Sequence, residues 1–282
     1  MKRDISVSTG AYDGYAMPDI LASMHRLGIK KVELAFIKGY VNEFTDADLN
    51  VGYAQELVGL MDSLGQQCPT FSGHINLGDD TALSQFEVRA RFAAELGAKR
   101  LITNAATRET AARFFQLAPE MAAIAKAHDI IVCLENPGDR VDNILNSAKD
   151  IQPLLSRLGS DAFGINYDVG NLISHCPDLD PVEDTRLALP YSAHLHIKDA
   201  YYRNHVYHFC ALGEGAIAFD TLLPHIAEDF SALSFSLELP FRLQRNDDAK
   251  PYKKPDLLTM PEIEDDLATS IAYLNKTMNL KE

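Results

Sequence analysis

The sequence alternates short apolar runs with longer amphipathic segments about eight times, and this alternation limits the possible folds more than any other feature. The apolar runs have the length of buried strands, and several of the helical segments stop at a glycine. Strands that alternate with helices form parallel sheets through right-handed crossovers. Eight such units in 282 residues predict an α/β fold, a single (β/α)₈ TIM barrel with parallel strands. A doubly wound open sheet is the alternative, but no glycine-rich nucleotide-binding motif follows the first strand.

We expect strands at 5–9, 31–36, 68–75, 100–103, 130–135, 163–168, 192–199 and 233–239. We expect helices at 18–27, 46–64, 81–96, 108–128, 141–158, 181–189, 219–227 and 260–274. Because no shift in composition marks a boundary, residues 1–282 are predicted to form one domain. The charged stretch 244–255 is predicted to be a surface loop after the last strand. Whether this loop acts as a lid over the site is not decided by the sequence.

The charge, hydropathy and cysteines of the chain limit the kinds of partner and the cell compartment that we expect for it. It has 26 basic and 40 acidic residues, a formal net charge of −14, which argues against a nucleic-acid partner. It has no apolar run of about 18 residues and no signal-peptide pattern, which predicts a cytoplasmic protein with no membrane partner. None of the four cysteines forms a C-x-x-C pair, and Cys68 and Cys133 are predicted to be buried, reduced thiols.

Acidic residues and a histidine stand where the predicted strands end, which is where a barrel of this kind builds its active site. Carboxylates that meet at one place repel each other unless a cation neutralises them. Mixed carboxylate and imidazole ligands suit Mn²⁺, Mg²⁺, Co²⁺ or Zn²⁺, and the absence of a thiolate argues against a structural zinc site. We therefore predict one divalent metal ion, with Mn²⁺ as the first choice. The residues at these strand ends are Glu33, Glu135, Asp168, His196 and Glu238.

Six stretches across nearly the whole barrel carry a family resemblance. They are Val32-Glu33-Leu34, Leu134-Glu135-Asn136, Tyr167-Asp168-Val169-Gly170-Asn171, His194-Leu195-His196-Ile197-Lys198-Asp199, Leu212-Gly213-Glu214-Gly215 and Leu237-Glu238. In their identity and order they resemble the xylose-isomerase-like barrel superfamily, which includes sugar isomerases, ketose 3-epimerases, inosose dehydratases and apurinic endonucleases. The H-x-K-D run followed by G-E-G is specific for the superfamily rather than for one activity.

The resemblance implies a metal ion held by Glu135, Asp168, His196 and Glu238. His196 matches the family ligand better than His194, because the ligand begins the His-x-x-Asp run. In the isomerase and epimerase branch, the glutamates that correspond to Glu135 and Glu238 act on opposite faces of the substrate. One removes a proton next to a carbonyl, and the other returns it through a cis-enediolate.

The chain also departs from the family pattern. Asn104 and Asn171 stand where the endonuclease branch needs extra histidines, and Tyr207-His208-Phe209 replaces an expected Asp-x-His. DNA cleavage is therefore disfavoured. Epimerases commonly have a substrate-binding histidine at the position of Asn171, so the identity of the sugar stays open. We expect substrate contacts from the following residues, with packing or structural ion pairs as the alternative: His74, Lys198, Glu33, Glu214, Asn104 and Asn171.

The combined prediction is a metal-dependent isomerase or epimerase of a sugar or sugar derivative. A dehydratase acting on a keto-polyol is the alternative, because an enediolate can also expel a β-hydroxyl group. A barrel that only binds a polyol, or an endonuclease, ranks lower. The partner is a small carbohydrate or polyol, and homo-oligomerisation is left open. Because Pro240-Phe241-Arg242 follows the last strand in place of a glycine-rich phosphate loop, an unphosphorylated substrate is favoured.

Overall fold

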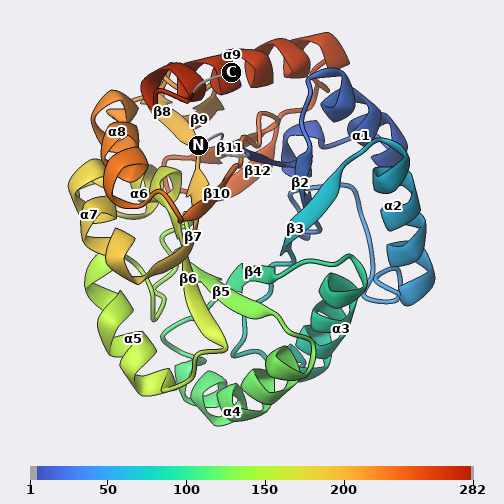
Figure 1. Cartoon of the computed structure of the whole chain (residues 1–282). Coiled ribbons are helices and arrows are strands. Elements are labelled where there is room, and N and C mark those ends of the chain that lie inside the picture. The colour runs from blue at the N-terminus through green and yellow to red at the C-terminus, as the bar shows by residue number, and fades with distance from the viewer. Residues whose placement is uncertain (1–4, 281–282) are drawn as a thin grey trace.

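Eight parallel strands close into a barrel in the computed structural model, which describes residues 5–280 (Figure 1). Around the barrel the strands follow the order β1-β10-β7-β6-β5-β4-β3-β2, and each neighbouring pair runs parallel. The predicted TIM barrel is confirmed. The barrel strands are β1 (Ser6–Ser8), β2 (Lys31–Ala35), β3 (Gln67–Ser72), β4 (Arg100–Asn104), β5 (Ile131–Glu135), β6 (Phe163–Asp168), β7 (Ser192–Ile197) and β10 (Ser234–Leu237).

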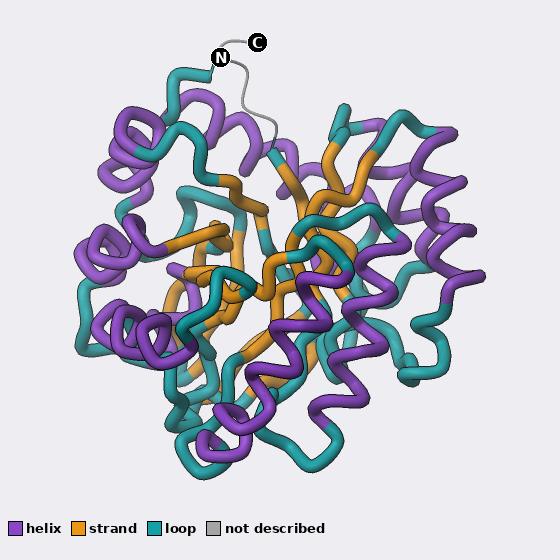
Figure 2. The backbone as a smooth tube through the Cα atoms, turned by 60° about the horizontal axis from the view of Figure 1, so that its bottom comes forward, coloured by secondary structure: helices purple, strands orange, loops and turns teal. Residues whose placement is uncertain are grey.

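Helices surround the barrel, as the two views show (Figures 1 and 2). In Figure 1 the chain runs around the ring from α1 in blue to α9 in red, and α9 closes the ring by packing on α1. Apolar side chains fill the space between strands and helices. The helices are α1 (Met17–Arg26), α2 (Val51–Ser63), α3 (Ala82–Glu95), α4 (Ala111–Ala127), α5 (Ile151–Leu158), α6 (Val169–His175), α7 (Pro181–Ala188), α8 (Phe219–Asp229) and α9 (Met260–Thr277), with short 3₁₀ turns η1 (Thr9–Tyr12), η2 (Ala148–Asp150) and η3 (Leu189–Tyr191).

Two predicted helices begin later than expected, because polar side chains cap them at an internal position. The Asn50 side chain accepts a hydrogen bond from the Tyr53 amide and starts α2 there, rather than at residue 46. Ser147 and Asp150 form a capping box that starts η2, so residues 141–147, predicted to be helical, are not. The sequence prediction also missed the short helix α6, which directly follows β6.

A second, antiparallel sheet interrupts the strand–helix alternation, in the order β12-β11-β9-β8. It corrects the prediction of a surface loop at 244–255, because most of β11 and all of β12 lie in that stretch. The hairpin between β8 and β9 turns at Asn204 and His205, which both have positive φ, as a tight two-residue turn requires. We call this sheet the accessory sheet. Its strands are β8 (Asp199–Arg203), β9 (Val206–Cys210), β11 (Leu243–Asn246) and β12 (Pro251–Lys253).

Two further predictions concern the environment of the chain. Within residues 5–280, no helix combines the length and the apolar character needed to cross a lipid bilayer. Cys68 and Cys133 are buried and unpaired, as predicted, and burial raises the pKa of each thiol to about 12.

Candidate metal centre

Strand register places the candidate ligands next to one another. Glu135 on β5 lies opposite Asn166 on β6, and Asp168 at the end of β6 lies opposite His196 on β7. Glu238 follows β10, and its backbone N–H donates to the Ile197 carbonyl at the end of β7. The four side chains therefore come from the carboxyl ends of consecutive strands around one arc of the barrel, which is where barrel enzymes place their active sites.

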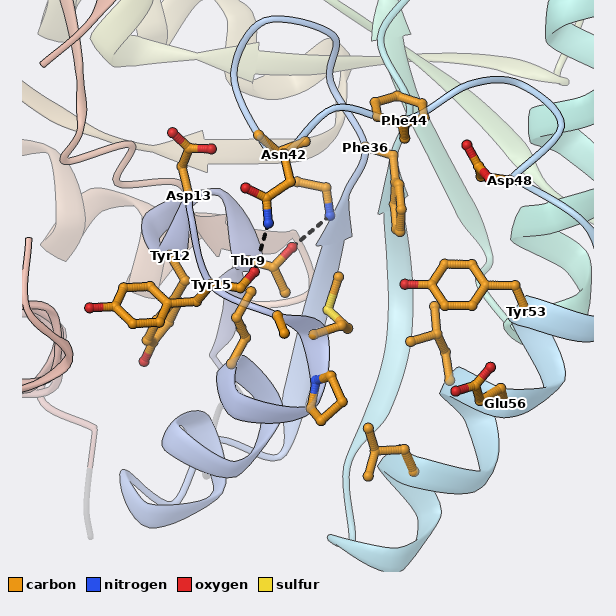
Figure 3. A pocket seen from close by; sticks show the side chains of 18 of the residues that line it. Thr9, Tyr12, Asp13, Tyr15, Phe36, Asn42, Phe44, Asp48, Tyr53 and Glu56 are labelled. Carbon is orange, nitrogen blue, oxygen red and sulfur yellow. Dashed lines mark hydrogen bonds between the residues drawn. The ribbon is translucent and has the colours of Figure 1, made fainter. Parts of the chain in front are cut away.

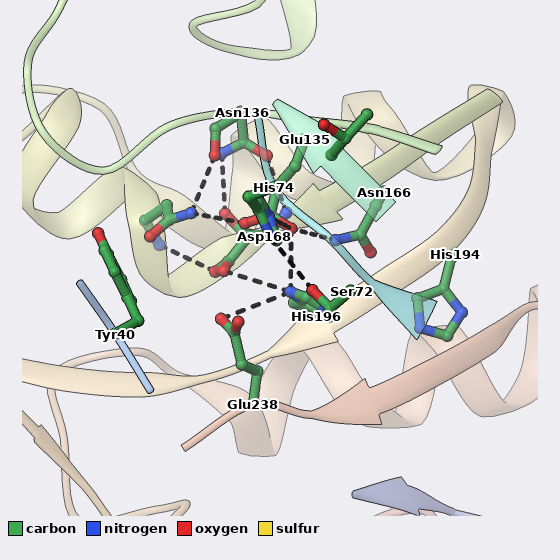
Figure 4. A network of polar contacts seen from close by, with 12 residues as sticks. Tyr40, Ser72, His74, Glu135, Asn136, Asn166, Asp168, His194, His196 and Glu238 are labelled. Atoms are coloured by element: carbon green, nitrogen blue, oxygen red, sulfur yellow. Dashed lines mark hydrogen bonds and ion pairs between the residues drawn. The ribbon is translucent and has the colours of Figure 1, made fainter. Parts of the chain in front are cut away.

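The four predicted ligands converge. Glu135, Asp168, His196 and Glu238 are all buried, and each offers one ligand atom within 4.8 Å of the others (Figure 4). Nδ1 of His196 lies 3.1 Å from Oε2 of Glu135, 3.5 Å from Oε2 of Glu238 and 3.8 Å from Oδ2 of Asp168. Three carboxylates around one imidazole form a donor set that suits a divalent cation.

The orientation of His196 is set by Glu33. Nε2 of His196 lies 3.1 Å and 3.2 Å from the two oxygens of Glu33, which can only accept, so Nε2 carries the proton. Burial works to lower the pKa of His196, but the surrounding carboxylates outweigh it and raise the pKa, so the ring without an ion favours its charged form. A bound divalent ion would take the place of the proton on Nδ1, a buried atom that has no hydrogen-bond partner. A carboxylate behind a histidine ligand is the usual way to fix such a ligand and raise its basicity.

Glu33 and His194 form the layer below the cluster. Burial works to raise the pKa of Glu33, but the adjacent His196 and His194 rings outweigh it and lower the pKa to about 2. His194 is hydrogen-bonded to Ser234 and Ser236 at 2.7 Å and 3.0 Å, and burial lowers its pKa to about 4. His194 is thus a satisfied, neutral residue. Because Glu33 faces the histidines, its predicted contact with a substrate remains a prediction.

Asp168 is held by the helix that follows it. It is the N-cap of α6, and its Oδ1 accepts the Asn171 backbone N–H at 3.0 Å, which leaves Oδ2 facing the cluster. The Asn136 side chain donates to the Asp168 carbonyl and accepts its amide, at 2.9 Å and 2.8 Å. These two bonds join the backbone of Asp168 to the residue that follows β5, and so fix where this backbone lies relative to Glu135.

Glu135 is held by three side-chain donors. Oε2 accepts from Nε2 of His74 at 3.2 Å and from Nδ2 of Asn166 at 2.6 Å, and Oε1 accepts from Nδ2 of Asn171 at 3.1 Å. Burial opposes ionisation, but the charges of His196 and His74 outweigh it and lower the pKa of Glu135 below its usual range. Of these donors, His74 and Asn171 were among the predicted site residues. Asn166 was not, although it lies two residues before Asp168 on the same face of β6.

Lys198 is the one lysine in direct contact with the cluster in the described part of the chain. Its Nζ lies 2.5 Å from Oδ2 of Asp168 and 2.5 Å from Oε2 of Glu238. Burial works to lower its pKa, but Asp168 and Glu238 outweigh that effect and raise it, so the amine is charged. The same ion pair lowers the pKa of Glu238 well below the usual range, against the effect of burial.

The remaining predicted residues lie at different distances from the cluster. Asn104 is opposite Glu135 in the β4–β5 register and so borders the site. Glu214 is exposed, and its charge acts on Asp266 of α9. The loop containing Glu214 is ordered by Asp199, whose carboxylate accepts the backbone N–H groups of Gly213 and Gly215 at 2.9 Å and 3.0 Å. The predicted substrate contact of Glu214 remains a prediction.

Sequence reasoning missed Arg245, a buried residue of β11 in the accessory sheet. Its guanidinium donates to Oδ1 of Asn171 and to Ser174 Oγ, and lies over the ring of Phe209 at 5.3 Å. No sequence motif marks Arg245 as a site residue, because it lies in a charged stretch that resembles a surface loop. It connects the accessory sheet to the network around Glu135.

A cavity of about 660 Å³ lies on another side of the barrel mouth, between α1 and α2 (Figure 3). Tyr15, Phe36, Phe44 and Tyr53 form much of its wall, and none of its lining residues belongs to the carboxylate cluster. The cavity is therefore separate from the convergent ligand atoms, and these atoms rather than the cavity define the candidate site.

Several solved structures have a similar fold. D-psicose 3-epimerase from Clostridium cellulolyticum H10 has a TM-score of 0.74 and 15% identity, over 99% of each chain. 3-keto-D-glucoside 4-epimerase from E. coli has a TM-score of 0.71 and 15% identity, over 98% of this chain and 100% of that one. A probable 3-DHS dehydratase from Bacillus anthracis has a TM-score of 0.69 and 15% identity, over 98% of this chain and 99% of that one. At such identities the likeness shows the fold alone.

No curated protein sequence matches the chain. A family model does: the one described as "Xylose isomerase-like TIM barrel" matches residues 21–259, well over half of the chain. The buried carboxylate and imidazole cluster described above lies inside that range. The match agrees with the resemblance carried by the sequence motifs. The chain belongs to the xylose isomerase-like TIM barrel family.

Proposed function

We propose that this protein is a divalent-metal-dependent isomerase or epimerase of a sugar or sugar derivative. The observation that carries the proposal is the convergence of Glu135, Asp168, His196 and Glu238 within 4.8 Å, with His196 Nδ1 unpartnered among three carboxylates. These four residues would hold one divalent ion, with Mn²⁺ as our first choice and Mg²⁺, Co²⁺ or Zn²⁺ as alternatives. When bound, the ion would supply Lewis-acid polarisation of the substrate's carbonyl and hydroxyl oxygens.

Glu135 and Glu238 are the proposed proton-transfer residues. Both carboxylates reach Nδ1 of His196, Glu135 from the end of β5 and Glu238 from the residue after β10, so they approach the site from different strands (Figure 4). The pKa of each is lowered, so both are carboxylates that can accept a proton. One would remove the proton next to the carbonyl and the other would return a proton on the opposite face. Three donors fix the direction of Glu135, which favours a defined approach to the C–H bond.

Charge balance supports an uncharged substrate. The buried carboxylates around the cluster are Glu33, Glu135, Asp168 and Glu238, and the nearby buried cations are Lys198 and Arg245. If His196 is neutral, as a ligand of the ion would be, two negative charges remain, which one divalent ion would balance. A phosphorylated substrate would add negative charge that nothing in this set compensates. We therefore propose an unphosphorylated ketose or keto-polyol.

A dehydratase is the second candidate, supported by Lys198. Its ammonium contacts Glu238 and can protonate a departing hydroxyl group after the same first proton removal. The likeness to a probable 3-DHS dehydratase is one of fold alone, but it is in keeping with this alternative.

The test is to incubate the protein with Mn²⁺ and a panel of ketoses and cyclic keto-polyols in D₂O, remove the metal, and analyse the products by mass spectrometry and NMR. Deuterium at a carbon next to the carbonyl without loss of water indicates an isomerase or epimerase, and loss of water indicates a dehydratase. Glu135→Gln and Glu238→Gln should each abolish exchange, whereas Glu109→Gln, an exposed glutamate in a loop, should not. Full exchange in either cluster variant would refute the mechanism.

A further inference from the structure

Proton transfer between Glu135, Glu238 and a substrate does not explain why the ammonium of Lys198 lies where it does. Its ammonium is in contact with two of the four proposed metal ligands at once, 2.5 Å from Oδ2 of Asp168 and 2.5 Å from Oε2 of Glu238. The side chain is 3% exposed, so this is a buried ion pair and not a surface contact that solvent would weaken.

The oxygens that Lys198 contacts are the same ones that face the imidazole. Oδ2 of Asp168 and Oε2 of Glu238 are the atoms that lie 3.8 Å and 3.5 Å from Nδ1 of His196. A divalent ion bonded to either oxygen at about 2.1 Å would stand within about 5 Å of the ammonium if Lys198 kept its place. A monovalent and a divalent cation at that separation repel strongly, even in a partly screened interior.

The stem of Lys198 is packed against α6, and its ammonium lies near a second group that can accept a cation. At Gly170, an added Cβ would overlap the Lys198 carbonyl, Cβ and Cγ, so α6 packs closely on the base of this side chain. The ammonium lies 5.5 Å from the ring centre of Phe209, in the accessory sheet, which offers a second place for a cation. Rotation about the outer bonds can therefore move the charge away from the carboxylates without moving the backbone.

We propose that Lys198 is a built-in competitor of the divalent ion: its ammonium neutralises Asp168 and Glu238 when no ion is bound, and ion binding displaces it towards the substrate. The proposal rests on the proposed function, because it takes the four-residue cluster as the metal site. Its first consequence is that Lys198 weakens metal binding while it stabilises the protein without metal. Its second is that the displaced ammonium donates to a substrate oxygen.

The experiment measures Mn²⁺ affinity by isothermal titration calorimetry and thermal unfolding with and without Mn²⁺. It compares the parent protein with Lys198→Met, which keeps the length of the stem and removes the charge, and Lys198→Arg, which keeps the charge. Lys126→Met is the matched control, because Lys126 is an exposed lysine of α4 that pairs with Asp161 far from the cluster. Asp168→Asn reports whether the measured ion binds at the cluster.

We expect Lys198→Met to bind Mn²⁺ at least about tenfold more tightly than the parent, because the competing charge is gone. Its unfolding temperature without Mn²⁺ should fall, and Mn²⁺ should raise it more than it raises that of the parent. Lys198→Arg should not gain affinity, and Lys126→Met should stay within about twofold of the parent. With saturating Mn²⁺, deuterium exchange by Lys198→Met should still be at least about tenfold slower than in the parent.

Equal or weaker Mn²⁺ affinity in Lys198→Met would overturn the proposed competition. Exchange at the parent rate in the Mn²⁺-saturated variant would overturn the substrate contact. If Lys198→Met does not fold, Lys198→Gln is measured in its place, and failure of both to fold in saturating Mn²⁺ would show that the ion cannot replace the ammonium. If neither the parent nor Lys198→Met shows binding that Asp168→Asn removes, the proposed function itself fails.

Discussion

Both terminal nitrogens of Arg245 donate to one atom, Oδ1 of Asn171, each at 3.1 Å. Because a guanidinium group can only donate, the Asn171 amide must turn its oxygen towards Arg245 and its nitrogen towards Glu135, whose Oε1 lies 3.1 Å away. The accessory sheet thus fixes the side chain that orients the proposed base. Arg245→Lys should remove this paired donation, because an ammonium lacks the planar arrangement of donors.

We expect Arg245→Lys to slow deuterium exchange by at least about tenfold through misplacement of Glu135, with little change in Mn²⁺ affinity. Stability should fall by about 2 kcal/mol, because charge-assisted hydrogen bonds are lost in a buried place. Arg203→Lys, at an exposed position of β8 in the same sheet, is the control and should change neither quantity. Parent-like exchange in Arg245→Lys would show that Asn171 needs no such support.

Gly138 provides the space for Arg245. A Cβ added at Gly138 would overlap Nη1, Cζ and Nη2 of Arg245, so any larger residue must push the guanidinium out of place. Gly138→Ala should therefore slow exchange as Arg245→Lys does, and lower stability by about 1–3 kcal/mol. Gly59 is the opposite case, because it lies within α2 and a Cβ there would meet nothing within 4 Å. We expect Gly59→Ala to raise the free energy of unfolding, measured in urea, by up to about 1 kcal/mol.

Glu33 should control metal affinity from behind His196. Glu33→Gln keeps the size of the side chain but removes the charge that holds and polarises the imidazole. We expect Mn²⁺ affinity to fall by about 10- to 100-fold in calorimetric titration, as is typical for loss of such a partner. The exposed Glu43→Gln should leave affinity unchanged. An unaltered affinity in Glu33→Gln would mean that His196 does not bind the ion through Nδ1.

Tyr12 should make stability depend on alkaline pH. Its hydroxyl lies 2.9 Å from Ser23 Oγ in the core, and burial raises the pKa of Tyr12 to about 12. In the unfolded chain the pKa is about 10, so above pH 10 the unfolded state loses a proton that the native state keeps. Stability should therefore fall by about 2–3 kcal/mol as the pH rises from 10 towards 12.

Urea unfolding of the parent and Tyr12→Phe between pH 8 and pH 11.5 or so tests this contribution. Tyr12→Phe should be about 1 kcal/mol less stable at pH 8, because one buried hydrogen bond is lost, but should lose less stability on going to high pH. Tyr252→Phe, at an exposed position, should follow the parent at every pH. Parallel pH curves for the parent and Tyr12→Phe would show that Tyr12 ionises as easily in the native protein as in the unfolded one.

The proposed metal ligands could be predicted from the sequence because the strands have clear ends and because all those ends share one face of the barrel. The strands are short apolar runs with clear ends, and in a parallel barrel all those ends open onto one face. A residue such as Glu135 or Glu238, last in its run or directly after it, must therefore border that face. The family motifs then separated His196 from its neighbour His194, which the structure shows to be bonded to two serines.

The accessory sheet escaped prediction for a physical reason. β11 pairs with β9, which lies more than thirty residues earlier in the chain, and both strands are short. A short strand with mixed polarity carries little periodic signal, and what makes it a strand is the partner that it meets in space. Arg245 thus looked like one more charge in a polar loop, although it is 2% exposed.

The sequence by itself determined the barrel, the set of strand-end residues that share its open face, and the family, because strand and helix periodicity and local motifs are properties of neighbouring residues. Only the tertiary structure decided that Glu33 backs His196 rather than meeting solvent, that Glu214 lies beside α9, and that Lys198 and Arg245 bring two buried positive charges to the cluster. These outcomes depend on side-chain direction and on contacts between segments far apart in the chain, which no local pattern encodes.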